Sequence, residues 1–174
     1  MSTNRTLLPG NRDITGDLNV RGNATIVGTI QQLDGTVNPV SKVIKKSITN
    51  AQMKALNTTP IELIAAPGAS KLIVVDKIVA KHQYLTAAFN DQDLTVGYDD
   101  GADLTVATID ATNFLNGVTA DTTRPSIVPI DGAAVLDTSA QIENENIALT
   151  ASGNPTTGGG TLDLYIWYTV ITVT

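Results

Sequence analysis

The sequence predicts an all-β protein, with an N-terminal stalk of short β repeats followed by an antiparallel β-sandwich or jelly roll containing one or two short helical turns. Three observations support this fold class. Thr (25), Ile (16) and Val (15) make up 56 of the 174 residues, and such β-branched side chains pack well on a pleated sheet. Glycine recurs at a fixed interval near the N-terminus. Short apolar runs separated by Gly, Pro, Asn and Asp make up the remainder.

The glycine repeat occupies residues 10–33, where glycines stand six residues apart in the hexads GNRDIT, GDLNVR, GNATIV and GTIQQL. A constant period over four units is typical of stacked short strands and tight turns. A segment this short cannot bury an apolar face alone, so we expect three copies of the chain to wind around one axis. The alternative is a flexible leader whose glycines recur by chance. The side chains expected to point towards the axis are Ile14, Leu18, Val20, Ala24, Ile26 and Ile30.

A polar segment that contains Gly35 and Pro39 follows the repeat, and we place the domain boundary there. The predicted domains are therefore 1–41, the stalk and linker, and 42–174, the β-sandwich.

The second domain begins with a predicted strand at 43–49. Thr49 or Asn50 can then cap a helical stretch at 51–56, and Pro60 prevents that helix from continuing. Asp110 can cap a second short turn that ends near Leu115. The further strands are expected at 61–65, 71–84, 94–98, 104–109, 124–130, 145–151 and 161–173. The Asp-Gly turn at 100–101 predicts that 94–98 and 104–109 pair as a hairpin.

Two of these predicted strands have a distinctive side-chain pattern. In 71–84, alternation places Leu72, Val74 and Ile78 on one side and Ile73, Val75 and Val79 on the other. The last strand is apolar on both faces, which indicates that both faces are covered. We expect one face of this strand to enter the core; its residues are Leu162, Leu164, Ile166, Tyr168 and Val170. We expect the other face to contact another subunit, although a loop of the same chain could cover it instead. The residues of that face are Tyr165, Trp167, Ile171 and Val173.

Charge is unevenly distributed along the chain. Residues 1–81 contain ten Lys and Arg and five acids, whereas residues 82–174 contain one Arg and twelve acids. The excess of lysine lies in 42–81. It could form a basic surface that docks on an acidic partner or on the acidic half of a neighbouring subunit. We favour the simpler interpretation that strands from the two halves interleave and the asymmetry disappears in space.

Composition and motifs argue against catalysis and against a cofactor. There is no cysteine, and the one histidine, His82, ends an apolar strand without a serine motif that it could activate, so we expect it at the surface or rim. The acids of 91–103 do not match an EF-hand, and the glycines of 158–160 precede a strand rather than a phosphate-binding helix. A net charge of −6 argues against nucleic acid, and no apolar run is long enough to span a membrane. We expect no catalytic, metal or cofactor site.

The hexads GDLNVRGNATIVGTI resemble the stalk and attachment repeats of tailed-bacteriophage fibres. The segments ALNTTPIELIAAPGASKLIVVDKIVAK, LTVGYDDGA and NPTTGGGTLDLYIWYTVI are similar to small phage virion proteins of the structural or decorating kind. This resemblance covers most of the chain but carries no catalytic residue. It implies a trimeric virion component built on a β-sandwich.

The sequence therefore predicts a non-enzymatic virion structural protein. We expect a homotrimeric capsid decoration or head-fibre protein that binds the major capsid protein or another virion component, on the capsid exterior rather than the tail. The alternative is a tail-fibre or receptor-binding module whose loops 99–103, 116–124 and 153–160 contact a host glycan or protein. A glycan-cleaving or other hydrolytic enzyme is a third hypothesis, which requires two facing carboxylates in a deep cleft.

Overall fold

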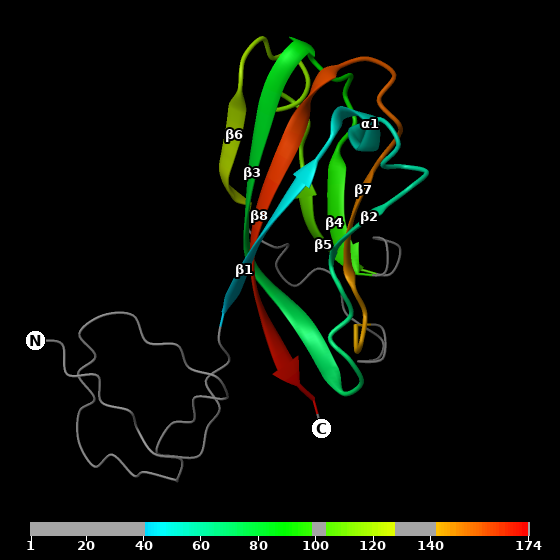
Figure 1. Cartoon of the computed structure of the whole chain (residues 1–174), viewed down its shortest axis with the longest axis vertical. Helices are drawn as coiled ribbons and strands as arrows, with labels where there is room; N and C mark the ends of the chain where they lie inside the picture. Colours follow the sequence, from blue (N-terminus) through cyan, green and yellow to red (C-terminus); the bar gives the residue numbers. More distant parts are fainter. Residues whose placement is uncertain (1–40, 99–103, 128–141, 174) are drawn as a thin grey trace, which may run out of the picture. The chain divides into compact units, whose positions relative to one another are not determined.

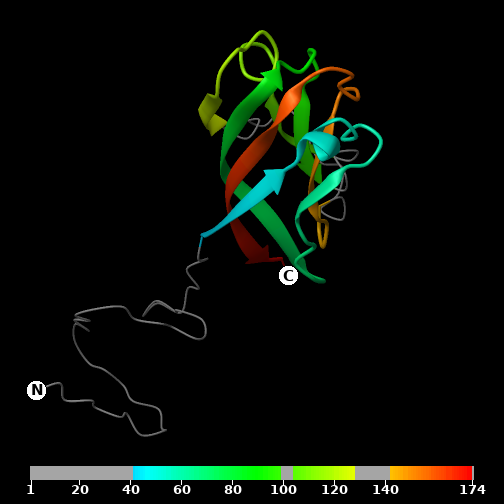
Figure 2. The same cartoon turned by 45° about the horizontal axis from the view of Figure 1, so that its top comes forward.

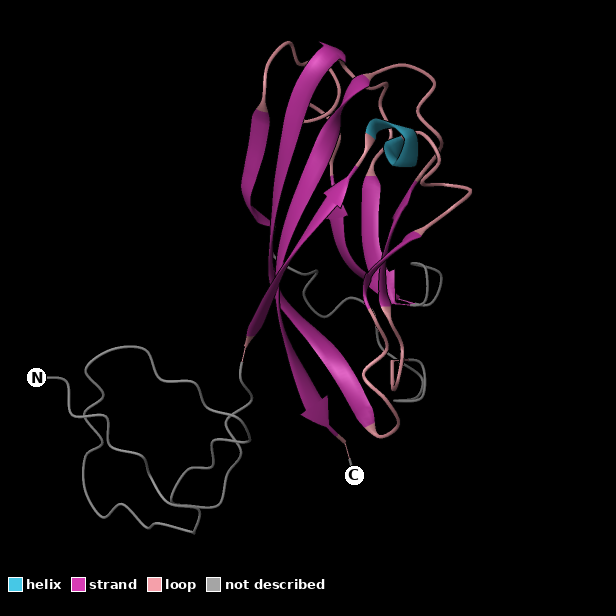
Figure 3. Cartoon of the chain, in the orientation of Figure 1, coloured by secondary structure: helices cyan, strands magenta, loops and turns pink. Residues whose placement is uncertain are grey.

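The computed structural model describes residues 41–98, 104–127 and 142–173. This part of the chain is all-β, as predicted, with eight strands and one four-residue helix (Figure 1 and Figure 3). It contains no helix that is long and apolar enough to cross a membrane. The elements in chain order are β1 (Lys42–Ile48), α1 (Asn50–Met53), β2 (Ile61–Ile64), β3 (Lys71–Ala87), β4 (Leu94–Tyr98), β5 (Leu104–Ile109), β6 (Thr122–Ile127), β7 (Ile147–Ala151) and β8 (Gly159–Thr172).

The strands form two antiparallel sheets of four strands each. The first sheet has the order β1-β8-β3-β6 and the second has the order β2-β7-β4-β5. Consecutive strands alternate between the two sheets, except that β4 and β5 are neighbours in one sheet. The predicted pairing of 94–98 with 104–109 is therefore confirmed. The residues that join these two strands, 99–103, lie outside the described residues.

The two sheets face each other across one apolar core (Figure 1 and Figure 2). Ile73, Ile78 and Leu164 of the first sheet are completely buried, as are Leu94 and Leu149 of the second sheet. Burying a side chain of this size stabilises a fold by about 1.5–3 kcal/mol. The inward-facing residues of both sheets thus fix the relative placement of the strands.

The helix α1 is shorter than predicted because its second turn tightens. Thr49 is the N-cap, and its hydroxyl accepts a hydrogen bond from the backbone N–H of Gln52 while the Gln52 side chain accepts one from the backbone N–H of Thr49. This capping box satisfies two N–H groups that a helix start leaves without partners. After Met53, the N–H of Ala55 donates to the carbonyl of Gln52 rather than one residue further back, and the α-helix ends.

Strand β3 contains a β-bulge that the sequence pattern did not reveal. The pairing with β8 shifts register between Val75 and Lys77. The extra residue exchanges the two faces, so Ile73 and Val75 before the bulge point to the same side as Ile78 after it. The predicted grouping of Leu72, Val74 and Ile78 on one side is therefore wrong.

Strand β8 lies between β1 and β3, and its inner face is the predicted one. Leu162, Leu164 and Ile166 are completely buried, and Tyr168 and Val170 pack against the same core. Strand β8 is paired with β1 along one edge and with β3 along the other.

Four connections, β1–β2, β3–β4, β5–β6 and β7–β8, gather at one end of the two sheets, at the top of Figure 1. Hydrogen bonds between them include those of the backbone N–H of Phe89 to the carbonyl of Leu115, at 3.0 Å, and of the backbone N–H of Thr156 to the side chain of Asn90, at 2.8 Å. As predicted, Asp110 caps a short turn that ends near Leu115: its carboxylate accepts from the N–H of Thr112 at 2.7 Å, and the carbonyl of Ala111 accepts from the N–H of Leu115 at 2.9 Å. We call this the four-loop end.

Candidate functional site

The outward-facing side of β1, β8 and β3 combines aromatic rings with lysines, and we call it the basic face. Strand pairing aligns Lys45 with Tyr165 and Lys77 with Trp167. The Lys45 ammonium lies 5.6 Å from the centre of the Tyr165 ring, and the Lys77 ammonium lies 5.4 Å from the centre of the Trp167 ring. Such cation–π contacts contribute about 0.5–1 kcal/mol at exposed sites. The aliphatic part of each lysine side chain covers part of the ring beside it, and both rings are half-buried.

All four residues predicted for a subunit contact, Tyr165, Trp167, Ile171 and Val173, lie in or directly after β8, and all four are partly exposed. The aliphatic neighbours Val43, on β1, and Val74, on β3, are 56% and 39% exposed. The face therefore offers apolar surface beside its lysines. Whether another subunit covers these residues remains a prediction.

The Asp163 carboxylate stabilises the basic face beside Lys45. Asp163 is only 7% exposed, and it accepts hydrogen bonds from the Lys45 ammonium at 2.8 Å and from the Ser47 hydroxyl at 2.6 Å. Burial alone would raise the pKa of Asp163, but the hydrogen bonds from Lys45 and Ser47 outweigh it, and the pKa lies below its usual value. Asp163 therefore remains charged and neutralises Lys45.

The charge asymmetry of the sequence persists in space, contrary to our expectation. The four strands of the first sheet carry seven Lys and Arg and two Asp, whereas the four strands of the second sheet carry only Glu62. The reason is that β1 and β3, the strands that hold the lysines, both flank β8 in one sheet. The strands interleave between the sheets, but the basic ones all enter the same sheet.

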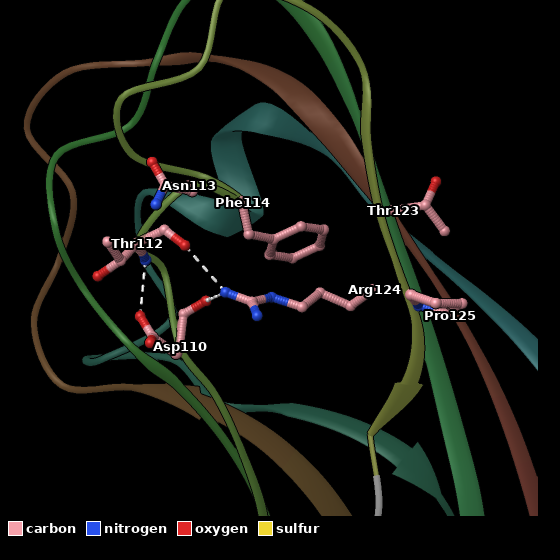
Figure 4. Close-up of a pocket in the computed structure, with 7 residues that line it drawn as sticks. All are labelled: Asp110, Thr112, Asn113, Phe114, Thr123, Arg124 and Pro125. Carbon is pink, nitrogen blue, oxygen red and sulfur yellow. Dashed lines mark hydrogen bonds between the residues drawn. The ribbon is translucent and has the colours of Figure 1, made fainter.

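A polar hollow of about 400 Å³ lies where the β5–β6 connection meets β6 (Figure 4). Arg124 extends across it with Nη2 donating to the backbone carbonyls of Asp110 and Thr112, at 3.0 and 2.9 Å. Its guanidinium lies 5.7 Å from the centre of the Phe114 ring, which is 1% exposed. Arg124 thus holds the turn in place, and the buried ring offers no open aromatic surface to a sugar. The residues that line the hollow are Asp110, Thr112, Asn113, Phe114, Thr123, Arg124 and Pro125.

His82 is completely buried, so the prediction of a surface or rim histidine is wrong. The bulge in β3 turns His82 inward, where its ring packs against the rings of Phe89 and Phe114 at 5.7 and 6.3 Å between centres. Among the described residues, neither ring nitrogen has a hydrogen-bond partner; the Phe114 carbonyl lies near the ring but not in hydrogen-bond geometry. Burial therefore lowers the pKa of His82. A general base needs partners that position it, and this ring contacts aromatic side chains instead.

The remaining predicted positions are placed as follows. The six stalk residues lie outside the described residues, as do the acids of 99–103. The Asp93 carboxylate accepts from the backbone N–H of Ala111 at 2.9 Å and so serves the fold. Within 41–98, 104–127 and 142–173, no three His, Cys, Asp or Glu side chains converge in a way that could hold a metal ion.

No protein-family model matches the chain, and a search of curated protein sequences finds no match. Among solved structures, the chain is similar to a protein of the cyanophage Pam1 capsid asymmetric unit, with a TM-score of 0.45, 14% identity, and coverage of 84% of this chain and 93% of that chain. The chain is also similar to a chain of the acid-stable capsid of Helicobacter pylori bacteriophage KHP30, with a TM-score of 0.42, 16% identity, and coverage of 78% of this chain and 94% of that chain. For a chain of Mud crab tombus-like virus, the TM-score is 0.26 and the identity is 11%, with coverage of 97% of this chain and 94% of that chain. All three TM-scores are below 0.5.

Sequence reasoning missed the burial of His82 and the concentration of charge in one sheet. The lysine excess of 42–81 was a usable signal for the concentration of charge, since its lysines are spaced along two predicted strands. The burial of His82 had no signal, because a bulge is not visible in the alternation of side chains.

Proposed function

We propose that this protein is a non-enzymatic structural component of a tailed-bacteriophage virion, a homotrimer that decorates the capsid or forms a head fibre. The observation that carries the proposal is the strand order β1-β8-β3-β6 and β2-β7-β4-β5. Eight antiparallel strands that alternate between two sheets in this way support a jelly-roll sandwich, an architecture that recurs in viral capsid proteins. The resemblance of the hexads to phage fibre repeats supports the same assignment from an independent part of the chain.

The trimer is proposed from the stalk. Its inward-facing side chains, from Ile14 to Ile30, alternate with glycines at a constant spacing, so three chains can supply the apolar faces that one chain lacks. The half-buried side chains Tyr165, Trp167, Ile171 and Val173 are proposed as a second subunit contact, in the body of the protein.

The partner on the particle is proposed to be the major capsid protein or another virion component, and the mechanism is mechanical. Bound copies add buried area between neighbouring capsid subunits, and a trimer that engages three equivalent sites gains affinity through multivalency. No reaction is assigned, since the buried His82 lacks polar partners and no metal site forms among the described residues.

Sedimentation equilibrium of the full chain tests the trimer directly. The proposal predicts a mass three times that of the 18.2 kDa chain, and a single-chain mass would contradict both the stalk and the trimer. Incubation with particles from which the protein has been stripped tests the location. Saturable binding to the shell supports capsid decoration, and binding confined to the tail contradicts it.

The alternative function is a receptor-binding module. The hollow around Arg124 favours it, because Asp110, Asn113 and Arg124 offer groups that hydrogen-bond sugars, and the hollow lies at the four-loop end. Strand β1 runs towards this end of the sheets and begins away from it (Figure 1). A glycan array probed with the full chain and with Arg124→Ala separates the two functions. Specific binding that Arg124→Ala abolishes would favour the receptor-binding module.

A further inference from the structure

The charges of the body are separated into a basic sheet and an acidic remainder. The strands of the first sheet have a net charge of +5, from seven Lys and Arg and two Asp. Outside these strands, the described residues contain one cation, Lys54, and seven acids. The seven are Glu62, Asp91, Asp93, Asp110, Asp121, Glu143 and Glu145. Outside the first sheet, the described residues therefore have a net charge of −6.

The basic face also has the apolar and aromatic content of a contact surface. Trp167, Tyr165 and the exposed Val43 and Val74 lie side by side across β1, β8 and β3. Aromatic residues are enriched at the centres of interfaces, whereas lysine is depleted there. A partner that buries this face must therefore neutralise Lys77 and Lys81, whose ammonium groups compete with apolar contact.

We propose that in the trimer the basic face of each copy packs against an acidic flank of the next copy, outside that copy's first sheet; this inference rests on the trimer of the proposed function. Packing two basic faces against each other would bring Lys77 and Lys81 of one copy towards those of the other, and such contacts between like charges are unfavourable. A contact between two different patches of the same chain is heterologous, and heterologous contacts form a ring when the rotation between copies closes. Charge separation within one chain thus favours a threefold ring over a face-to-face dimer.

Two features of the chain make this contact measurable. Trp167 is the only tryptophan, so its fluorescence reports on the middle of the basic face without background. Lys45 and Asp163, 2.8 Å apart in one chain, provide an internal positive control for carbodiimide, which joins a lysine to a carboxylate that it touches.

The test uses the full chain, carbodiimide cross-linking and acrylamide quenching of Trp167. We expect mass spectrometry of the covalent trimer band to show Lys77 or Lys81 joined to an acid outside the first sheet. We expect the single-chain band to show the Lys45–Asp163 link without that second link. We also expect Trp167 to be quenched several-fold less in the trimer than in the unfolded chain.

The variant is Lys77→Glu, and its matched control is Lys54→Glu, which makes the same change in net charge away from the basic face. We expect Lys77→Glu to reduce the inter-chain link by about tenfold and to increase quenching of Trp167, because it places a negative charge against an acidic flank. Lys54→Glu should leave both readouts unchanged. Thermal unfolding of each variant confirms that it is folded. Lys77→Gln, which removes the charge without reversing it, should give an intermediate effect.

The failure of this inference can be told apart from that of the proposed function. A trimer by sedimentation, with no link from the basic face between chains and with Trp167 fully open to acrylamide, would overturn the packing and leave the trimer intact. Links between basic faces, through Lys77 and the neighbouring copy's Asp76, would also overturn it. A single-chain mass for the wild-type protein would overturn both.

Discussion

Acidification should destabilise the fold through His82 before Asp110 and Asp163 titrate. The ring is completely buried against Phe89 and Phe114, and neither nitrogen has a hydrogen-bond partner among the described residues. Burial lowers the pKa of His82 in the folded state below the ordinary value of 6.5, against weaker opposing effects of the Phe114 carbonyl and of Asp121. The unfolded chain therefore takes up the proton first. Stability is complete above 6.5 and is lost as the pH falls below that value.

The size of the effect follows from linkage. One group that is protonated only in the unfolded chain removes about 1.4 kcal/mol per pH unit, down to the pH at which the folded chain also takes up the proton. For a domain of this size each kcal/mol lost lowers the melting temperature by about 2–4 °C. Asp110 and Asp163 have lowered pKa values, so their contributions are lost only below the ordinary value of 3.8. The loss through His82 therefore begins at a higher pH than the loss through these two carboxylates.

Urea unfolding at several pH values, for the wild type and for His82→Leu, measures this contribution. Leucine approximates the ring volume and cannot be protonated, so the variant should show a flat free energy of unfolding over the histidine window. It should also be no less stable than the wild type at neutral pH, because two unpartnered nitrogens are removed. Parallel pH profiles for the two proteins would refute the reasoning and would mean that the buried ring finds a partner when it is charged.

Replacing Val20 and Ile26 together by Asp should weaken assembly, because charge would be buried at the threefold axis; an unchanged mass in sedimentation equilibrium would place both side chains in water. Gly160→Ala should lower the free energy of unfolding in urea by about 1–3 kcal/mol, because its Cβ would collide with the Gln83 carbonyl and lie 2.8 Å from Nε2 of His82. Unchanged stability would contradict this close packing. EDTA should leave the melting temperature unchanged, because no metal-binding group forms among the described residues; a drop of several degrees would reveal a bound cation.

Features that depend on local chemistry were predicted well from the sequence. The inner face of β8, from Leu162 to Ile166, follows from strict alternation, and the N-cap at Thr49, one of the two predicted candidates, follows from its side-chain oxygen. The turn residues around 99–103 correctly indicated that the flanking strands pair. In each case the residues that decide the structure are close together in the chain.

Features that depend on distant parts of the chain were not predicted. The bulge near Lys77 is decided by how β3 fits against β8, about ninety residues away, and it carries no local signature. It reverses the faces of the second half of β3 and buries His82. The basic face likewise forms because β1 and β3 flank the same strand, a pairing that the spacing of lysines alone does not specify. The aromatic side of β8 was predicted correctly, but its partial cover by Lys45 and Lys77 was not.

Cryo-electron microscopy of intact virions would show where this protein lies on the particle. We expect threefold-symmetric density on the outside of the icosahedral shell, into which three copies of the two-sheet body fit with each basic face against the next copy. Density for this protein confined to the tail would contradict capsid decoration and favour the receptor-binding module. Its absence from the virion would contradict the structural role altogether.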